Sequence, residues 1–135
     1  MATNECIPLF RTGDGDITGH TTGPVTGGTF VELSGSIQSG PGLNSSTNGG
    51  NFQVATAGAG VSAFGVAAYD AASGKKVPVI RSGNVVPMVA DGNITVDDLI
   101  EVGTAGKPKT KASGVTVGKA TTTAASGAVV FVEIA

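Results

Sequence analysis

Short stretches in which apolar residues alternate along the chain recur from Phe52 onward, and turns rich in Gly, Asn, Asp and Ser separate them. The last stretch, residues 128–134 (AVVFVEI), shows the pattern most clearly. Its Val130, Val132 and Ile134 share one parity, and Val129 and Phe131 share the other, so the two sets face opposite sides of a strand. Short strands between turns are typical of a β-sandwich or β-barrel. The pattern therefore predicts an all-β fold.

The same reading predicts how some of these strands pair. Residues 75–81 and 85–90 are joined by Ser82-Gly83-Asn84, which predicts a hairpin. Residues 115–123 and 128–134, separated by a short Ala/Ser/Gly turn, predict a second hairpin at the C-terminus. Residues 94–102 (ITVDDLIEV) fit either a turn of helix or a strand, and a tight turn leading into a strand is favoured. No repeat of fixed period stands out.

Both faces of the last strand are apolar. One face covers the core of the domain, and the other is expected to be covered by closure of a small barrel or by another chain. Val129 and Phe131 are therefore the candidates for self-association.

The N-terminal third differs from the rest. Residues 5–11 (ECIPLFR) form a short apolar segment that Gly-rich turns separate from the later strands. We interpret residues 1–27 as an N-terminal arm with a Gly/Thr-rich lead-in, and residues 28–135 as one β-barrel-like domain. Within that domain, residues 34–51 contain almost no large apolar side chain, which predicts a long Gly/Ser-rich surface loop.

Composition narrows the class of protein. The chain has 135 residues, enough for one domain, with 22 Gly, no Trp, 13% charged residues and a net charge of −2. These values disfavour a helical bundle and provide no positive field for nucleic acid or an anionic membrane. Lys107, Lys109 and Lys111 alternate, and edge protection or solvation is favoured over contact with nucleic acid or an acidic partner. The N-terminus lacks the basic and apolar regions of a signal peptide, which predicts synthesis in a cytoplasm without secretion.

Candidate chemistry is sparse. The single cysteine, Cys6, cannot form an internal disulfide. The single histidine, His20, would have to be the base of any Ser–His–acid triad, but the sequence contains no G-x-S-x-G motif to supply the serine nucleophile. Adjacent Asp97 and Asp98 would point apart in a strand or cap a turn. The Asp14-Gly15-Asp16 stretch lacks the later acids of a calcium loop. No catalytic, cofactor-binding or metal-binding residue is predicted, and a binding or structural module remains.

The order of motifs resembles a known family. FGVA (64–67) is followed by GKKVPVIR (74–81), ADGNI (90–94), DLIEVG (98–103), GVTVGKA (114–120) and AASGAVVFVEI (124–134). The opening residues 5–35 fit the same group. Together they resemble the head decoration, or cement, proteins of tailed bacteriophages, particularly those infecting actinobacteria.

The resemblance implies a β-barrel-like or β-tulip-like domain with an extended N-terminal arm. It also implies a virion protein that binds the outer capsid surface and bridges major capsid protein subunits. Trimers are the favoured state, with monomers or dimers possible; no enzyme activity, cofactor, nucleic acid or membrane is involved. The candidate capsid contacts are Ile7, Pro8, Leu9, Phe10 and Arg11, and the alternative is that Ile7, Leu9 and Phe10 form the first strand of the protein's own core.

Two rival functions remain open at this point. The first is a phage fibre-base or host-surface attachment protein, with the loop at residues 34–51 contacting a receptor. The second is a small β-barrel hydrolase that would need a partner chain to complete a site around His20.

Overall fold

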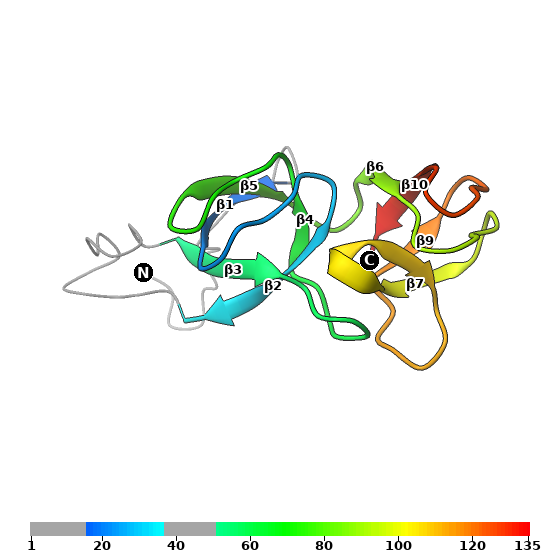
Figure 1. Ribbon diagram of the computed structural model, residues 1–135, viewed down its shortest axis with the longest axis horizontal. Helices are drawn as coiled ribbons and strands as arrows, with labels where there is room; N and C mark the ends of the chain where they lie inside the picture. The colour runs from blue at the N-terminus through cyan, green and yellow to red at the C-terminus, as the bar shows by residue number, and fades with distance from the viewer. Residues whose placement is uncertain (1–15, 37–50) are drawn as a thin grey trace, which may run out of the picture.

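The computed structural model describes residues 16–36 and 51–135, and these residues contain ten β-strands and one short 3-10 turn. The strands form two groups that lie side by side along the long axis of the molecule (Figure 1). The all-β prediction is confirmed. The elements are β1 (Asp16–Thr21), β2 (Phe30–Gly35), β3 (Phe52–Thr56), β4 (Gly65–Ala67), β5 (Lys76–Ile80), β6 (Val85–Val89), β7 (Leu99–Val102), η1 (Thr104–Gly106), β8 (Pro108–Thr110), β9 (Gly118–Ala120) and β10 (Val129–Ile134).

The first group is a closed five-stranded barrel in the order β1-β3-β2-β4-β5, here called the first barrel. Strand β1 closes it, because it pairs in parallel with β3 and antiparallel with β5. The prediction of a small β-barrel is confirmed by this group. Strand β1 lies within residues 1–27, so part of the segment interpreted as a lead-in is a barrel strand. Residues 1–15 lie outside the described residues, and the division of the chain into arm and domain stays a prediction.

The second group is a five-stranded sheet in the order β6-β10-β9-β7-β8, here called the second sheet. Its two ends approach each other, because the Asp91 N–H, just after β6, donates to the Pro108 carbonyl of β8 at 2.8 Å. With that bond counted as a closure, the circular order becomes β6-β8-β7-β9-β10. This order matches the β1-β3-β2-β4-β5 order of the first barrel strand for strand. The chain therefore contains the same five-stranded arrangement twice.

One turn motif occurs four times, twice in each half, and supports the equivalence of the two halves. In each copy a bridge residue is followed three positions later by a residue with positive φ, and then by a strand. The bridge residues pair with each other within each half, Val25 with Ala71 and Ile94 with Ala124. A type II turn requires positive φ at its third residue, which favours glycine there. The four residues at that position are Gly28, Gly74, Asp97 and Gly127.

The core consists of two apolar clusters. The smaller one lies inside the first barrel and is built from valines of β2, β3 and β5 with Ala67 of β4. The larger one fills the second sheet and extends into the first barrel through Phe30, Ala57 and Val66. Phe30 and Val31 are neighbours in β2 and both fully buried, yet they belong to different clusters. The two halves therefore share part of one core.

The two predicted hairpins had opposite outcomes. Strands β9 and β10 pair antiparallel, as expected at the C-terminus. The hairpin of residues 75–81 with 85–90 is wrong, because β5 pairs with β1 and β4 whereas β6 pairs with β10. Ser82-Gly83-Asn84 instead carries the chain from the first barrel to the second sheet. Its polar groups bind the C-terminal strand, where the Gly83 N–H donates to the Ile134 carbonyl at 2.8 Å.

Candidate interaction surface

An apolar surface covers the outer side of β6 and β10. Strand β10 sends Val130, Val132 and Ile134 into the core and leaves Val129 and Phe131 outside, which confirms the predicted alternation. The antiparallel register sets Val129 opposite Val89 and Phe131 opposite Pro87. We call this surface the apolar face; its members are Val85, Pro87, Val89, Val129 and Phe131.

The members of the apolar face are unusually accessible for such large apolar side chains. Val129 is 54% exposed and Phe131 is 44% exposed. A contiguous apolar surface of this kind is a common feature of protein–protein contact sites, whereas single exposed apolar residues are ordinary. Val129 and Phe131, the candidates for self-association, therefore lie together on one accessible surface with three further apolar residues. Their role in self-association stays a prediction.

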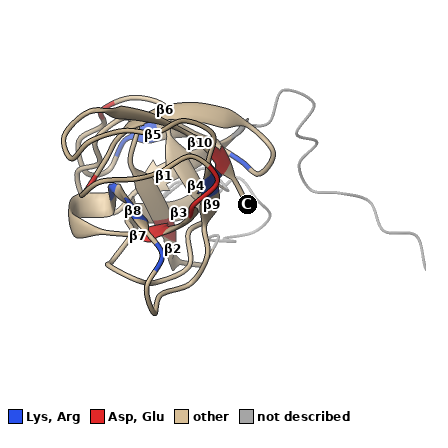
Figure 2. Ribbon diagram, turned by 90° about the vertical axis from the view of Figure 1, so that its right-hand side faces the viewer, with Lys and Arg blue, Asp and Glu red and all other residues tan. Residues whose placement is uncertain are grey.

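Charged residues border the apolar face along one side. Strand β6 contains no charged residue, and its ribbon is tan in Figure 2; β10 contains one charged residue, Glu133. Glu133 lies opposite Lys119 of β9. The Lys119 Nζ is 2.8 Å from a carboxylate oxygen of Asp97, and this contact raises the pKa of Lys119 above its ordinary value. Both partners are well exposed, so the pair contributes little to folding stability.

Asp97 and Asp98 lie in a turn, which was one of the two alternatives that the sequence left open. Asp98 accepts a hydrogen bond from the Thr95 N–H at 2.9 Å and thereby closes the turn that precedes β7. Asp97 occupies the positive-φ position of that turn. The two carboxylates do not converge on a pocket.

Among the lysines at 107, 109 and 111, Lys109 lies in the edge strand β8 and has a partner. Its Nζ is 3.7 Å from a carboxylate oxygen of Glu101 in β7. Glu101 is 5% exposed although it is charged. The sequence analysis missed its structural role, and an acid between Ile100 and Val102 in an apolar strand was the available signal.

The other candidate groups gain no site in the described part of the chain. His20 lies in β1 and is partly buried; its pairing partner on β5 is Lys76. Within residues 16–36 and 51–135, no group of three or more His, Cys, Asp or Glu side chains could hold a metal ion. None of the helices in the same residues has the length and apolar character needed to span a membrane. Cys6, Asp14 and the predicted capsid contacts Ile7, Pro8, Leu9, Phe10 and Arg11 lie outside the described residues.

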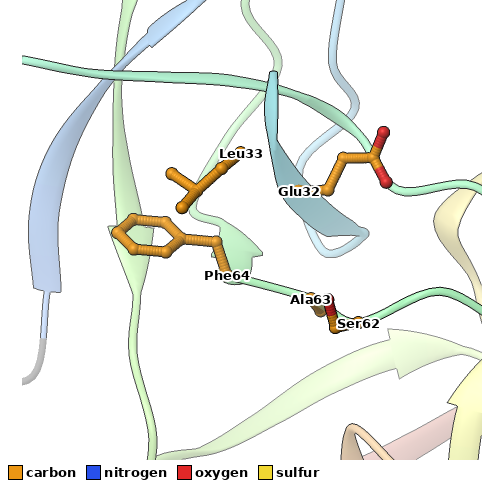
Figure 3. A pocket seen from close by; sticks show the side chains of 5 residues that line it. All are labelled: Glu32, Leu33, Ser62, Ala63 and Phe64. Carbon is orange, nitrogen blue, oxygen red and sulfur yellow. The ribbon is translucent and has the colours of Figure 1, made fainter. Parts of the chain in front are cut away.

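A small hollow of about 200 Å³ is present on the first barrel. Figure 3 shows Leu33 and Phe64 on one side of it, with the Glu32 carboxylate pointing away from them. The Phe64 ring also packs under the Arg81 guanidinium, with the cation 3.9 Å from the ring centroid. The other residues that line the hollow are Ser62 and Ala63, so its wall combines polar and apolar groups.

Comparison with known families now defines the class of protein. Residues 11–135 match the model of the phage cement protein family, and the chain belongs to that family. Membership supports a structural, capsid-associated role in the virion and supports a function other than catalysis. The narrower likeness to proteins of actinobacteriophages stays a prediction.

A solved structure shares the fold of this chain. The chain is similar to the crystal structure of the head fiber gp8.5 N base in bacteriophage phi29, with a TM-score of 0.67 and 17% sequence identity. The similarity covers 89% of this chain and 92% of that one. At this identity the likeness shows a shared fold. No curated protein matches the sequence.

Proposed function

We propose that the protein binds the outer surface of an assembled phage capsid and bridges neighbouring major capsid protein subunits, which stabilises the DNA-filled head. The family match over residues 11–135 is the observation that carries this proposal. A ligand that binds the assembled shell in preference to free subunits shifts the assembly equilibrium toward the shell by mass action. A protein that spans a subunit boundary also adds contacts that outward pressure must break.

The apolar face supports a role in self-association. Copies that share this face would bury Val129 and Phe131, which are otherwise accessible. A trimer is the state we favour, because three linked contacts with the capsid raise the effective concentration of each remaining contact. Sedimentation equilibrium of the purified protein measures this state directly. A monomer at capsid-saturating concentrations would remove the trimer from the proposal.

The capsid contact is assigned to residues Ile7, Pro8, Leu9, Phe10 and Arg11. An extended apolar segment can add to a foreign sheet edge, where main-chain hydrogen bonds supply affinity. Deletion of residues 1–11 should abolish capsid binding and leave the all-β circular dichroism spectrum and the melting transition in place. Loss of the folded state on deletion would show that these residues belong to the protein's own core.

The decisive experiment for the cement function is co-sedimentation with mature capsids stripped of this protein, compared with immature shells. Saturable, stoichiometric binding to the mature shell is the expected result. If the folded protein binds neither shell, the cement function fails for this chain.

A second candidate function is the base of a head fibre or of a host-attachment structure. The fold likeness to a head fiber N base favours it. This function predicts adhesion of protein-coated beads to host cells. Adhesion without stoichiometric capsid binding would favour the second function over the first.

A further inference from the structure

One residue of the loop between β3 and β4 makes main-chain hydrogen bonds on both of its sides, to β7 and to the connection between β8 and β9. Gly60 donates its N–H to the Val102 carbonyl at 2.8 Å, and its carbonyl accepts the Val115 N–H at 3.0 Å. The φ of Gly60 is +73°, a conformation that glycine adopts without steric cost. Gly60 therefore lies between β7 of the second sheet and the connection from β8 to β9, as a short extra strand would.

The outer of these two segments, residues 111–115, is held from beneath by Glu101. A single carboxylate oxygen of Glu101 accepts the Ala112 N–H at 3.0 Å and the Gly114 N–H at 2.6 Å. Hydrogen bonds to an ionised acceptor are roughly twice as strong as neutral ones. The segment leaves no room for a side chain, because a Cβ on Gly114 would lie 2.6 Å from that oxygen and 2.7 Å from the Cα of Gly60.

We propose that residues 111–115 form a strap, pinned by the Glu101 carboxylate, that locks the first barrel to the second sheet through Gly60 and opens when Glu101 is protonated. The strap is a conformational device within one chain, so it does not depend on the capsid function. With the strap closed, the two halves behave as one body. With the strap open, the shared core and the Ser82-Gly83-Asn84 connection still join them.

The charges around Glu101 favour its ionised form. Lys109 of β8 faces it at 3.7 Å, and Lys119 of β9 is diagonal to it but pairs with Asp97. Asp91 lies across Gly103 and binds the Thr104 N–H, and Lys111 of the strap itself is exposed. The loop that contributes Gly60, residues 57–61, contains no titratable side chain.

The direction of the pH dependence follows from the hydrogen bonds. The Ala112 and Gly114 N–H groups lower the pKa of Glu101 below its ordinary value, with a smaller contribution from Lys109. A carboxyl with a lowered folded-state pKa stabilises the closed strap at and above the ordinary carboxyl pKa. That stabilisation is lost as the pH falls through the lowered value. Acid therefore opens the strap, and alkali does not.

Native-state hydrogen exchange, corrected for intrinsic rates, tests the strap amide by amide. Glu101→Gln should speed exchange of the Val115, Ala112 and Gly114 amides on the order of tenfold at neutral pH, because the acceptor loses its charge. Glu133→Gln, an exposed acid on the same side of the sheet, is the matched control and should leave them unchanged. Core amides such as that of Val132 should not respond to either variant.

An acid titration of the same amides completes the test. In the unsubstituted protein the strap amides should lose protection at low pH before the core amides do, whereas in Glu101→Gln this early loss should be absent. If strap and core amides lose protection together, the strap is no separate device and the proposal fails. It fails equally if Glu101→Gln leaves strap exchange unchanged.

Gly114→Ala gives a second route that does not alter a charge. Its Cβ would displace the strap from Glu101 and Gly60, so the same amides should lose protection at all pH values. Gly23→Ala is the control, because nothing lies within 4 Å of that Cβ position. Equal protection in Gly114→Ala and in the unsubstituted protein would overturn the assignment.

Discussion

The first barrel and the second sheet share a strand order but differ in what they present to solvent. Counted from the bridge residues of the turn motif, Lys76 and Pro78 of β5 are equivalent to Val129 and Phe131 of β10. In the same way, Thr18 and His20 of β1 are equivalent to Pro87 and Val89 of β6. The first half thus has polar or charged residues at three of four positions where the second half is wholly apolar.

This difference separates what the fold needs from what the surface does. Positions that the two halves keep alike are buried, such as Val77 in β5 and Val130 in β10, both fully covered. The four diverging positions compared above are exposed or half-buried in the first half and exposed in the second, so the core places little demand on them. An apolar set retained on an outward surface in one half alone points to contact with another molecule.

The largest effect is expected where the two halves share a core. Phe30→Ala removes a fully buried ring from the cluster that fills the second sheet, although Phe30 itself lies in β2 of the first barrel. A buried Phe→Ala change costs about 3–5 kcal/mol. The variant should therefore destabilise the second sheet as well as the first barrel, measured by denaturant unfolding with hydrogen exchange of β10 amides.

Val31→Ala is the matched control for this prediction. Val31 is the next residue in β2 and equally buried, but it packs only in the cluster of the first barrel. Its loss should lower protection in the first barrel more than in β10. Equal losses in both halves for both variants would show that the two clusters act as one.

The apolar face supplies the next largest effect. Val129→Lys places on β10 the residue that β5 carries at the equivalent position, and Phe131→Lys removes the ring beside it. Truncating central interface residues costs about 2 kcal/mol or more, roughly a 30-fold loss of affinity. Self-association should fall accordingly while the melting temperature changes little, since both side chains are exposed.

The reverse exchange on the first barrel controls for surface charge. Lys76→Val changes an exposed residue of β5 at the position equivalent to Val129. It should leave self-association unchanged in sedimentation equilibrium. A comparable effect from both exchanges would mean that the apolar face has no special role.

The sequence predicted the faces of single strands better than it predicted the pairing between strands. Local alternation identified β10 and its two faces correctly, because a period of two directly encodes the faces of a strand. Pairing between strands was predicted less well. Ser82-Gly83-Asn84 has the composition of a hairpin turn. However, the valines of β5 and the buried residues of β6 pack in two separate clusters, so β5 and β6 belong to different sheets.

The internal duplication was not predictable from periodicity. The turn motif begins its bridges at Val25, Ala71, Ile94 and Ala124, so its spacing along the chain is irregular. The four copies of the motif share only two features. The bridge residue is small or β-branched, and a residue with positive φ follows it. Strand β1 was missed for a related reason. It is a strand of the closed barrel, but its Thr and Gly residues show little alternation of apolar and polar side chains.

The turns of the four motifs give a smaller and more exact comparison. Gly74→Ala and Gly127→Ala should each destabilise the protein by about 1–2 kcal/mol, since an L-residue in the left-handed region clashes with its own backbone. Nothing lies within 4 Å of either added Cβ, so the loss comes from the backbone alone. Chemical denaturation measures it, and unchanged stability in both variants would contradict the account of these turns.

Asp97 is the one member of the four that is not glycine, and its replacement by glycine should have a much smaller effect. Aspartate tolerates positive φ better than most residues, and glycine gains freedom in the unfolded chain that offsets the strain it relieves. Asp97→Gly should therefore change stability by less than about 0.5 kcal/mol, whereas Asp97→Val should cost about 1 kcal/mol or more because a β-branched side chain fits this region poorly. Lys119→Met isolates the loss of the ion pair that both Asp97 variants share. A strong loss in Asp97→Gly that Lys119→Met reproduces would show that the ion pair, rather than backbone geometry, explains why this turn keeps an aspartate.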